Sequence, residues 1–455
     1  MASTQPNRRS NLGRPVGQDP LGTPVRRAAL RLLDAVLRRG EPLEAALASA
    51  TRALPGGPDR GLAHAIAAET LRRLPDLDAL IDSATKQRLP DDAKARMTLR
   101  IALAQALALR TPPHAAIATV LPLVDGGPRK LVHGVFGTLM RGGAALPEAP
   151  TLPGEVADRW RANWGDGVVG AAARAFAAPP PLDLSLKPAP SASPAKAGAQ
   201  LRDAPQLSPG LRRGSEDEGQ TLAPDHLRLP AGTSVPDLAG FAEGDWWVQD
   251  LAASIPARLI GPARGTVLDL CAAPGGKTLQ LAAAGWQVTA VDASEGRLAR
   301  LRENLARTRL DAKVIRADLR QWQPKAPADA VLLDAPCSAT GIFRRHPDVL
   351  YRAHPRVIAD MAELQRTLFA RAADWVRPGG TLVYATCSLE PEEGEAQLDA
   401  FLAAHPDFTV APPMDGELPP GIPVTDRGAV RTLPGTLADA GGCDGFFIAR
   451  LIRNG

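Results

Sequence analysis

Apolar positions recur at intervals of three and four residues through the first third of the chain. The stretch VRRAALRLLDAVLRR, residues 25–39, places leucine, alanine and valine on one helical face and arginine on the other. The same spacing predicts helices over residues 61–74, 78–86, 93–109 and 128–140, separated by segments rich in Pro, Gly and Asp, which end helices. Residues 23–146 are therefore predicted to form an all-helical bundle.

From residue 265 the pattern changes to short apolar runs separated by amphipathic segments. Strands are predicted for GTVLDL (265–270), WQVTAVD (286–292), AKVIRAD (312–318), DAVLLDAP (329–336) and GTLVYATCS (380–388). Helical spacing returns between them, over 278–285 and 295–309. This alternation predicts an α/β, Rossmann-like domain over residues 246–455, with a mostly parallel sheet and helices on both faces. In such a sheet, functional groups lie at the carboxyl ends of the strands.

The remaining segments are predicted to connect these two domains or to extend from them. Residues 147–245 are expected to form a connecting domain, with helices near 156–164 and 167–178 and short strands up to Trp247. Within it, residues 191–220 are rich in Pro, Ala and Ser, which predicts a flexible insertion. Residues 1–22 are polar and are expected to be a disordered tail. Trp246 and Trp247 are candidates for stacking on a base, although at least one is expected in the core.

Charge is unevenly distributed although the net value is only +4. Residues 1–150 contain 21 Lys+Arg against 13 Asp+Glu, a balance of +8, whereas the remainder contains 32 against 36, a balance of −4. A basic, arginine-rich first third favours a polyanionic partner, with plain solubility as the alternative. The chain has no apolar run long enough for a membrane span and no secretory signal, so a cytoplasmic, monomeric protein is expected.

A glycine-rich turn follows the first predicted strand, in the sequence DLCAAPGGKT. Small residues and the pair Gly275 and Gly276 allow backbone N–H groups to approach a ligand closely. The ending GGKT resembles a phosphate-binding loop, but that motif requires glycine where this chain has Cys271, and Pro274 interrupts the loop. A nucleoside triphosphatase is therefore not favoured.

Four aspartates occupy the ends of four successive predicted strands: Asp269, Asp292, Asp318 and Asp334. A single aspartate in such a position is weak evidence, since acids often begin helices or sit in turns. Asp292 is suited to ribose hydroxyls, and Asp318 to an adenine amine. No pyrophosphate fingerprint accompanies them, so an adenosine with a cationic or neutral tail is the expected ligand. S-adenosylmethionine fits this description.

Two of the four cysteines, Cys337 in APCS and Cys387 in ATCS, directly follow predicted strands. Taken singly, each would be interpreted as a small buried residue. Together, at two strand ends beside Asp334, they indicate nucleophilic chemistry. None of the cysteines has the spacing of a zinc site or of a disulfide framework, so free thiols and no metal are expected. Residues 390–393, after the second cysteine, are interpreted as the start of a solvated segment.

Several long motifs resemble one known family, the Sun/Fmu-type ribosomal RNA (cytosine-C5)-methyltransferases. They are DLCAAPGGKT, VDASEGRL, LLDAPCSATGIFRRHPD, LVYATCSLEPEE and DGFFIARL, and together they cover nearly all of residues 247–452. Upstream, PRKLVHGVFGTLMR resembles the NusB-type RNA-binding bundle. One departure lies in LDLSLK, where Ser185 and Lys187 stand in place of an Arg and an Asn that family members tend to carry.

The resemblance implies a function and a set of site residues. Cys387 would add to carbon 6 of a cytosine in RNA, with 16S ribosomal RNA as the expected substrate, and Cys337 would assist product release. Asp334 would hydrogen-bond the base, and Arg344, Arg345 and His346 could supply positive potential to the thiolate or hold RNA phosphates. S-adenosylmethionine would contact Cys271, Ala272, Ala273, Pro274, Gly275, Gly276, Lys277, Asp292, Asp318 and Asp334.

Alternative functions remain open. A non-catalytic, antitermination-like RNA-binding factor would share the fold, but the two cysteines argue against it. Methylation of another RNA, such as transfer RNA, would use the same chemistry. A DNA cytosine methyltransferase would normally rely on the cysteine of the PC motif alone, so the thiol of Cys387 argues against that class.

Overall fold

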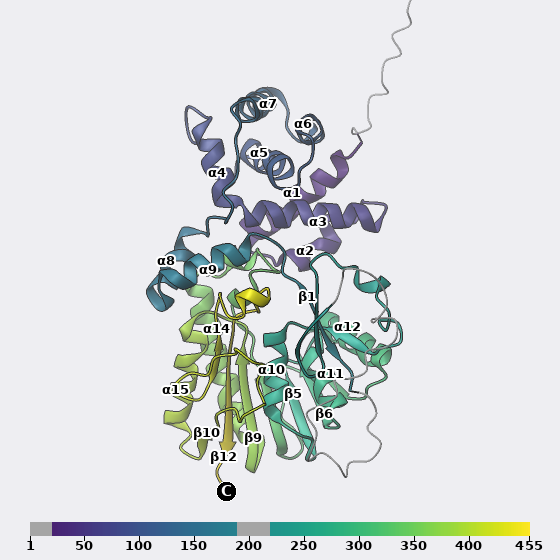
Figure 1. Ribbon diagram of the computed structural model, residues 1–455, viewed down its shortest axis with the longest axis vertical. Helices are drawn as coiled ribbons and strands as arrows, with labels where there is room; N and C mark the ends of the chain where they lie inside the picture. The colour runs from purple at the N-terminus through teal and green to yellow at the C-terminus, as the bar shows by residue number, and fades with distance from the viewer. Residues whose placement is uncertain (1–20, 189–218) are drawn as a thin grey trace, which may run out of the picture. The chain divides into compact units, whose positions relative to one another are not determined.

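The computed structural model describes residues 21–188 and 219–455. The chain divides into two compact units, Met1–Leu146 and Pro147–Gly455 (Figure 1). The predicted tail (1–22) and insertion (191–220) fall outside the described residues, apart from Leu21, Gly22, Gly219 and Gln220. Residues 147–245 belong to the same compact unit as the α/β domain.

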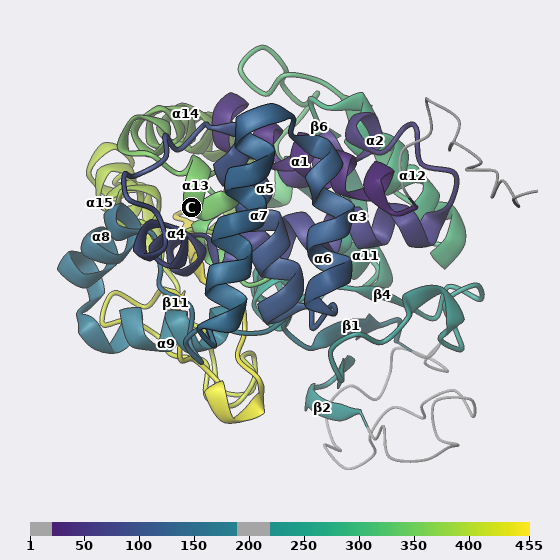
Figure 2. The same cartoon turned by 90° about the horizontal axis from the view of Figure 1, so that it is seen from above.

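The first unit is helical in all the secondary structure that is described for it. Its helices are α1 (Thr23–Arg39), α2 (Leu43–Ala50), α3 (Gly57–Arg72), α4 (Leu74–Ser83), α5 (Lys94–Leu103), α6 (Pro113–Val120) and α7 (Gly126–Arg141), and Ala104–Ala108 continues α5 as a π-helix. Figure 2 shows α5, α6 and α7 lying beside one another. The apolar face of α1 supplies buried Leu32 and Leu33. Helices α2 and α6 were not predicted, because eight residues are too few for the spacing of apolar positions to indicate a helix.

The second unit begins with two helices and a small antiparallel sheet. The helices are α8 (Gly154–Trp164) and α9 (Asp166–Phe176), and the strands are β1 (Leu182–Leu186), β2 (Gln220–Ala223), β3 (His226–Leu229) and β4 (Trp246–Val248), in the order β2-β3-β1-β4. Both Trp246 and Trp247 are buried. Stacking of either indole on an RNA base is therefore excluded in this conformation.

The larger sheet carries the order β10-β12-β9-β8-β5-β6-β7, with β11 paired to β12. Its strands are β5 (Thr266–Leu270), β6 (Gln287–Asp292), β7 (Lys313–Arg316), β8 (Ala328–Asp334), β9 (Val376–Thr386), β10 (Phe408–Val410), β11 (Val430–Thr432) and β12 (Phe446–Arg453). Strands β5 to β9 pair in parallel, and β12 runs antiparallel to β9. The predicted mostly parallel, Rossmann-like sheet is confirmed.

Helices cover both faces of this sheet, as Figure 1 shows. They are α10 (Leu251–Ile260), α11 (Gly276–Ala283), α12 (Glu295–Thr308), α13 (Val349–Arg352), α14 (Pro355–Asp374) and α15 (Glu395–Ala404). Successive strand residues point to opposite faces, so Leu333 and Tyr384 pack in the same core as α14 and α15. Leu332 and Val383 pack instead in the core that contains α10. Burial on both faces explains why these strands are continuously apolar in sequence.

The strand order reverses between β5 and β8. From β5 the chain proceeds outward to β6 and β7, and then returns to the other side of β5 to form β8 and β9. Adjacent parallel strands whose connections leave in opposite directions open a crevice at their carboxyl ends. The predicted site residues all follow strands that end at this edge.

Removing the central aromatic ring of the α14 face should destabilise the second unit. Phe369 is stacked between Tyr384 and Phe401, with ring centroids 4.3 Å and 3.9 Å away. Phe369→Ala would leave a cavity between sheet and helices, and we expect a loss of about 3–5 kcal/mol in the free energy of unfolding. Urea denaturation followed by tryptophan fluorescence measures it. Val357→Ala, at an exposed position of the same helix, should cost under about 1 kcal/mol.

Candidate active site

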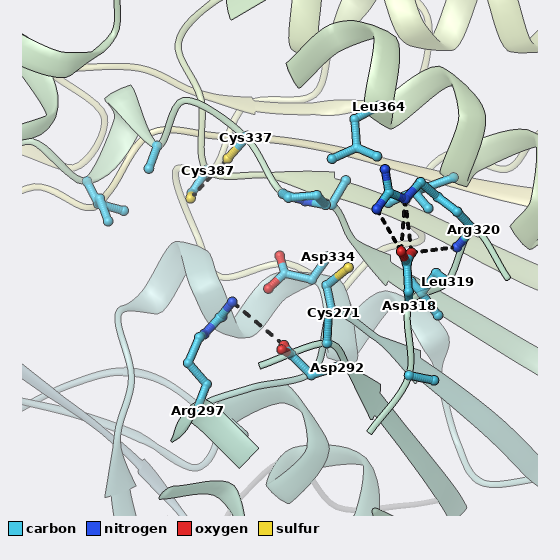
Figure 3. A pocket seen from close by; sticks show the side chains of 17 residues that line it. Cys271, Asp292, Arg297, Asp318, Leu319, Arg320, Asp334, Cys337, Leu364 and Cys387 are labelled. Carbon is cyan, nitrogen blue, oxygen red and sulfur yellow. Dashed lines mark hydrogen bonds and ion pairs between the residues drawn. The ribbon is translucent and has the colours of Figure 1, made fainter. Parts of the chain in front are cut away.

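A pocket of about 610 Å³ opens at the carboxyl ends of the parallel strands (Figure 3). Its lining comes from the ends of five strands, from the segments that follow them and from helices α12 and α14. The lining residues are Cys271, Asp292, Ala293, Arg297, Ala317, Asp318, Leu319, Arg320, Asp334, Ala335, Pro336, Cys337, Ala339, Ile342, Leu364, Leu368 and Cys387. The volume lies within the range of small-molecule and cofactor sites.

The turn between β5 and α11 has a backbone that few residues can adopt. Cys271 has φ 60° and Gly275 has φ 112°, both in the left-handed region. A Cβ added at Gly275 would lie 3.0 Å from Cγ of Leu301, so this glycine also permits close packing on α12. The Ala273 N–H donates to Oδ2 of Asp292 at 3.1 Å, which ties the turn to the end of β6.

The ten residues predicted to contact the cofactor fall into two groups. The pocket is lined by Cys271, Asp292, Asp318 and Asp334. The structure does not bring the others into the lining; they form the turn itself and the start of α11: Ala272, Ala273, Pro274, Gly275, Gly276 and Lys277. Ala272 to Gly276 shape the backbone beneath the pocket, and the side chain of Lys277 contacts the pocket residue Asp334.

Asp318 lies two residues beyond β7 and is held by a partner that sequence reasoning missed. Nε of Arg320 donates to both carboxylate oxygens at 3.1 Å, and a second guanidinium nitrogen donates at 2.7 Å. These hydrogen bonds lower the pKa of Asp318 to about 2. The carboxylate is therefore charged and oriented at the pocket wall, and Arg320 lines the same wall.

Lys277 forms an ion pair with Asp334 on the cysteine side of the pocket. Its Nζ lies 2.8 Å from Oδ2 of Asp334 and 5.5 Å from the ring centre of Phe446. Burial alone would lower the pKa of the Lys277 ammonium, but the Asp334 carboxylate outweighs that effect and raises it. A protonated lysine therefore accompanies Asp334.

The two predicted catalytic cysteines lie against each other. Cys337 Sγ and Cys387 Sγ are 3.4 Å apart, and both line the pocket (Figure 3). The parallel register pairs Asp334 with Ala385, so Cys337 and Cys387 lie three and two residues beyond paired positions. The contact with Cys387 and burial together raise the pKa of the Cys337 thiol well above its ordinary value.

The segment that follows Cys387 differs from the sequence-based expectation. Residues 390–393 were predicted to be solvated, but the side chains of Glu390 and Glu393 are both 0% exposed. Glu390 accepts hydrogen bonds from Arg159 at 2.7 Å and from the Trp160 indole at 3.1 Å. Buried carboxylates with partners far along the chain leave no local signature in sequence.

Arg344 and Arg345, expected to supply positive potential to the thiolate or to hold RNA phosphates, form ion pairs with carboxylates in the structure. Arg344 is buried and donates to Asp444 at 2.9 Å and to Asp250 at 3.1 Å. Arg345 donates to the same Asp250 oxygen at 2.9 Å. The two carboxylates neutralise this cluster, which links α10 to the segment before β12. The sequence FRRHPD gave no sign of these partners, because they lie about a hundred residues away.

The site fits an S-adenosyl cofactor by its size and its charge. Three carboxylates, Asp292, Asp318 and Asp334, line one pocket that also has apolar walls from Leu319, Leu364 and Leu368. Carboxylates suit hydroxyl and amine donors and a positively charged tail, whereas they would repel a pyrophosphate. The fold and the pocket thus define a Rossmann-like methyltransferase.

Comparison with known proteins gives the family. Residues 259–452 match the family model described as "16S rRNA methyltransferase RsmB/F", and residues 23–137 match that of the NusB family. "Ribosomal RNA small subunit methyltransferase B" of Xylella fastidiosa is 36% identical over 446 residues, covering 95% of this chain and 99% of that protein. Its namesake from Xanthomonas campestris is 35% identical, covering 95% and 98%.

Solved structures agree on the fold. PH0851 superposes with a TM-score of 0.67 at 22% identity, covering 93% of this chain and 98% of the other. A methyltransferase homologue from Pyrococcus horikoshii gives a TM-score of 0.51 at 25% identity, covering 70% and 98%.

The chain belongs to the RsmB/F family of ribosomal RNA methyltransferases and carries an N-terminal NusB-family domain. The predicted enzyme class, an RNA methyltransferase of the cytosine-C5 type, is confirmed by this membership. In the described ranges 21–188 and 219–455, no three His, Cys, Asp or Glu side chains are grouped to hold a metal ion. No helix within those ranges has the length and apolar character to cross a membrane.

Asp269 is the one aspartate of the predicted four that does not line the pocket. It is 0% exposed, Thr278 Oγ1 donates to its Oδ2, and its Oδ1 has no hydrogen-bond partner among the described residues. Burial, assisted by the charges of Asp334 and Asp292, raises its pKa to about 7. The unfolded chain would show a value near 3.9.

A raised pKa in the folded state means that stability is lost as the pH rises through it. The contribution of Asp269 should be complete below about pH 4 and absent above about pH 7, a difference of at most about 4 kcal/mol. Asp269→Asn should therefore flatten the fall in stability between about pH 4 and pH 7. Urea unfolding of both proteins without cofactor measures this, and parallel pH profiles would contradict it.

Proposed function

We propose that this chain methylates carbon 5 of a cytosine in small-subunit ribosomal RNA, with Cys387 as nucleophile and S-adenosylmethionine as donor. The observation that carries the proposal is the pair of thiols 3.4 Å apart, from adjacent strands, in the wall of the carboxylate-lined pocket. The names of the related proteins support ribosomal RNA of the small subunit as substrate. The same thiols favour catalysis over a purely RNA-binding role.

Cytosine carbon 5 is a poor nucleophile until the ring is activated. Addition of the Cys387 thiolate to carbon 6 breaks the π bond between carbons 5 and 6. Its electron pair moves onto carbon 5, with delocalisation to the ring nitrogen, so that carbon 5 can attack the methyl group while the donor sulfur takes the electrons of the methyl–sulfur bond. This is covalent catalysis, in which one difficult step becomes two easier ones. Asp334 lies in the same wall, and its carboxylate would accept a hydrogen bond from the exocyclic amine, and from the ring nitrogen when that nitrogen is protonated. Lys277, whose Nζ lies 2.8 Å from Oδ2 of Asp334, holds this carboxylate in place.

Product release requires a base that removes the proton from carbon 5. Electrons of that C–H bond then reform the double bond, and the Cys387 thiolate leaves carbon 6. Cys337 is the neighbouring group, and carbon 5 is adjacent to the ring atom bonded to Cys387. As a thiolate, Cys337 would take this proton, and the geometric contact with Cys387 is what places it for that step.

The cofactor would be held by the remaining pocket wall. Asp292 at the end of β6 would accept from ribose hydroxyls, and Asp318 from the adenine amine. Asp292 is already oriented, because the Ser294 N–H donates to its Oδ1 at 2.8 Å and the Ala273 N–H to its Oδ2. When bound, S-adenosylmethionine supplies the electrophilic methyl group.

The N-terminal unit would contribute affinity for the RNA backbone. Arg129 and Lys130 at the start of α7 are exposed, in the basic first 150 residues, whose charge balance is +8 against −4 for the remainder. Phosphate contacts of this kind are independent of sequence and weaken with salt. The target cytosine would have to be unpaired or extruded to reach the thiols. The expected monomeric state remains a prediction.

Substitution of the two cysteines should have two different effects on the reaction. Cys387→Ala should lower methyl transfer by at least about a thousandfold, because no adduct can form, while cofactor affinity stays the same. Cys337→Ala should accumulate a protein–RNA adduct that survives a denaturing gel, because release is blocked. Transfer of a tritiated methyl group to 16S RNA fragments, followed by gel electrophoresis, measures both.

Cys443→Ala provides the matched control, since Cys443 is a buried thiol outside the pocket lining. It should retain activity and form no stable adduct. Normal turnover by the Cys387 variant would refute the nucleophile assignment, and normal release by the Cys337 variant would refute the release assignment.

Asp292→Ala should weaken binding of the cofactor but not binding of RNA. Loss of a charged acceptor for ribose hydroxyls should raise the Kd for S-adenosylmethionine tenfold to a hundredfold, about 1.5–3 kcal/mol, with RNA affinity unchanged within twofold. Isothermal titration calorimetry for the cofactor and filter binding for the RNA give the two values. The exposed Asp311, just before β7, offers a charge-matched control as Asp311→Ala. Equal losses in both affinities would contradict the assignment.

A further inference from the structure

Glu393 joins the two cysteine-bearing segments through one buried carboxylate. Its Oε1 accepts from the Ser338 N–H at 2.8 Å and from Nε2 of Gln365 at 3.1 Å. Its Oε2 accepts from the hydroxyls of Ser338 and Ser388. The side chain is 0% exposed, so these four donors replace water completely.

The donors are the residues next to the thiols. Ser338 follows Cys337 and Ser388 follows Cys387, and their hydroxyl oxygens lie 3.2 Å apart. Gln365 of α14 also donates to the Pro336 carbonyl at 2.8 Å, on the other side of Cys337. The carboxylate therefore binds both segments one residue away from the reacting sulfurs.

The backbone of Glu393 holds the same region from the strand side. Its carbonyl accepts from the Tyr384 hydroxyl at 2.9 Å and from Oγ1 of Thr386 at 3.1 Å. Both donors belong to β9, directly before Cys387. Glu393 is thus fixed to the rigid sheet while its side chain reaches the loop after β8.

We propose that Glu393 is a positioning residue for the two-thiol reaction: it sets the separation of Cys337 and Cys387 by hydrogen-bonding the serine beside each of them. This inference rests on the proposed roles of the thiols. The β-sheet fixes only the strand ends, and the sulfurs lie two or three residues farther along irregular backbone. A common acceptor removes the independent motion that these two segments would otherwise have.

The charge of Glu393 also affects the ionisation of Cys337. Burial raises the pKa of Glu393, while the serine and glutamine donors favour the carboxylate. Its negative charge contributes to the raised pKa of Cys337. The carboxylate that positions this thiol therefore also favours its protonated form.

The first measurement reports thiol placement without RNA or cofactor. Hydrogen peroxide takes two electrons from the thiols of Cys337 and Cys387 to give a disulfide, and with their two protons it becomes two molecules of water. A disulfide requires the sulfurs to approach from 3.4 Å to about 2.05 Å in a specific orientation. Peptide mapping by mass spectrometry at timed intervals gives the rate of this 337–387 bond.

Glu393→Gln keeps the size of the side chain but removes the charge and one acceptor oxygen. We expect disulfide formation to slow at least tenfold. In the Cys337→Ala background, where adducts accumulate, the rate of Cys387–RNA adduct formation should fall at least tenfold, with the Kd for S-adenosylmethionine unchanged within twofold. Glu393→Asp, which keeps the charge but cannot span both serines, should restore neither rate.

Glu390→Gln is the matched control. Glu390 is equally buried and three residues away, but its side chain binds Arg159 and Trp160 of α8. It should lower thermal stability as Glu393→Gln does and leave both rates within threefold of wild type. If the two variants behave alike in both rates, Glu393 is a structural residue only and the proposal is wrong.

Two further outcomes distinguish a failure of the Glu393 proposal from a failure of the proposed catalytic roles. If Glu393→Gln does not fold, Ser338→Ala removes the Ser338 hydroxyl donor and keeps its N–H donor to Glu393. This variant should slow both reactions at least threefold, and unchanged rates would overturn the proposal. If Cys387→Ala still methylates RNA, the catalytic assignment fails, and the disulfide rate alone judges whether Glu393 positions the thiols.

Discussion

The parallel pairing of β8 with β9 is the constraint on which the catalytic geometry depends. Its register places Asp334 opposite Ala385, so the two chains leave the sheet at the same level. Cysteines fifty residues apart in sequence thereby reach a sulfur–sulfur distance of 3.4 Å. A shift of one residue would turn each side chain to the opposite face and would separate the thiols.

The cationic partner of each carboxylate determines whether that carboxylate can accept hydrogen bonds from a ligand. Asp318 and Asp334 each have a cationic partner at the pocket, Arg320 and Lys277 respectively. Asp269, buried beneath the pocket, has only a hydroxyl partner, and its pKa rises to about 7. The pKa of Asp318 stays well below neutrality, whereas that of Asp269, which supports the turn, is about 7.

Much of this arrangement could be predicted from the sequence because it is local. Period-two and period-3.6 patterns locate strands and helices, and the strand order places Asp292, Asp334, Cys337 and Cys387 at one edge. Antiparallel β12 was missed, although its apolar run FFIARL is plain, because periodicity does not reveal how a strand pairs. The short β10 and β11, with three residues each, are below the length at which alternation is informative.

Groups whose role depends on distant partners could not be predicted. Arg344 looked like a phosphate ligand because its neighbours in sequence are basic, but its partners Asp250 and Asp444 lie about a hundred residues away on either side. Glu393 looked solvated because PEE is polar, but four donors surround its carboxylate inside the fold. The sequence shows that a residue is polar, but only its tertiary contacts determine whether it is buried.

The position of Glu393 also explains why the thiols need support beyond the sheet. In the proposed reaction, covalent addition and proton removal act on adjacent ring atoms, so an error of about 1 Å between the sulfurs would misplace one step whenever the other is correctly aligned. Backbone contacts contribute, since the Gly341 N–H donates to the Cys387 carbonyl at 3.0 Å. A Cβ at Gly341 would lie 1.9 Å from the Gly445 carbonyl oxygen, so this close approach requires glycine. The Gly341–Cys387 contact joins the two segments through backbone atoms only. The hydrogen bonds of Glu393 join the same segments through the side chains of Ser338 and Ser388, the residues next to the two cysteines.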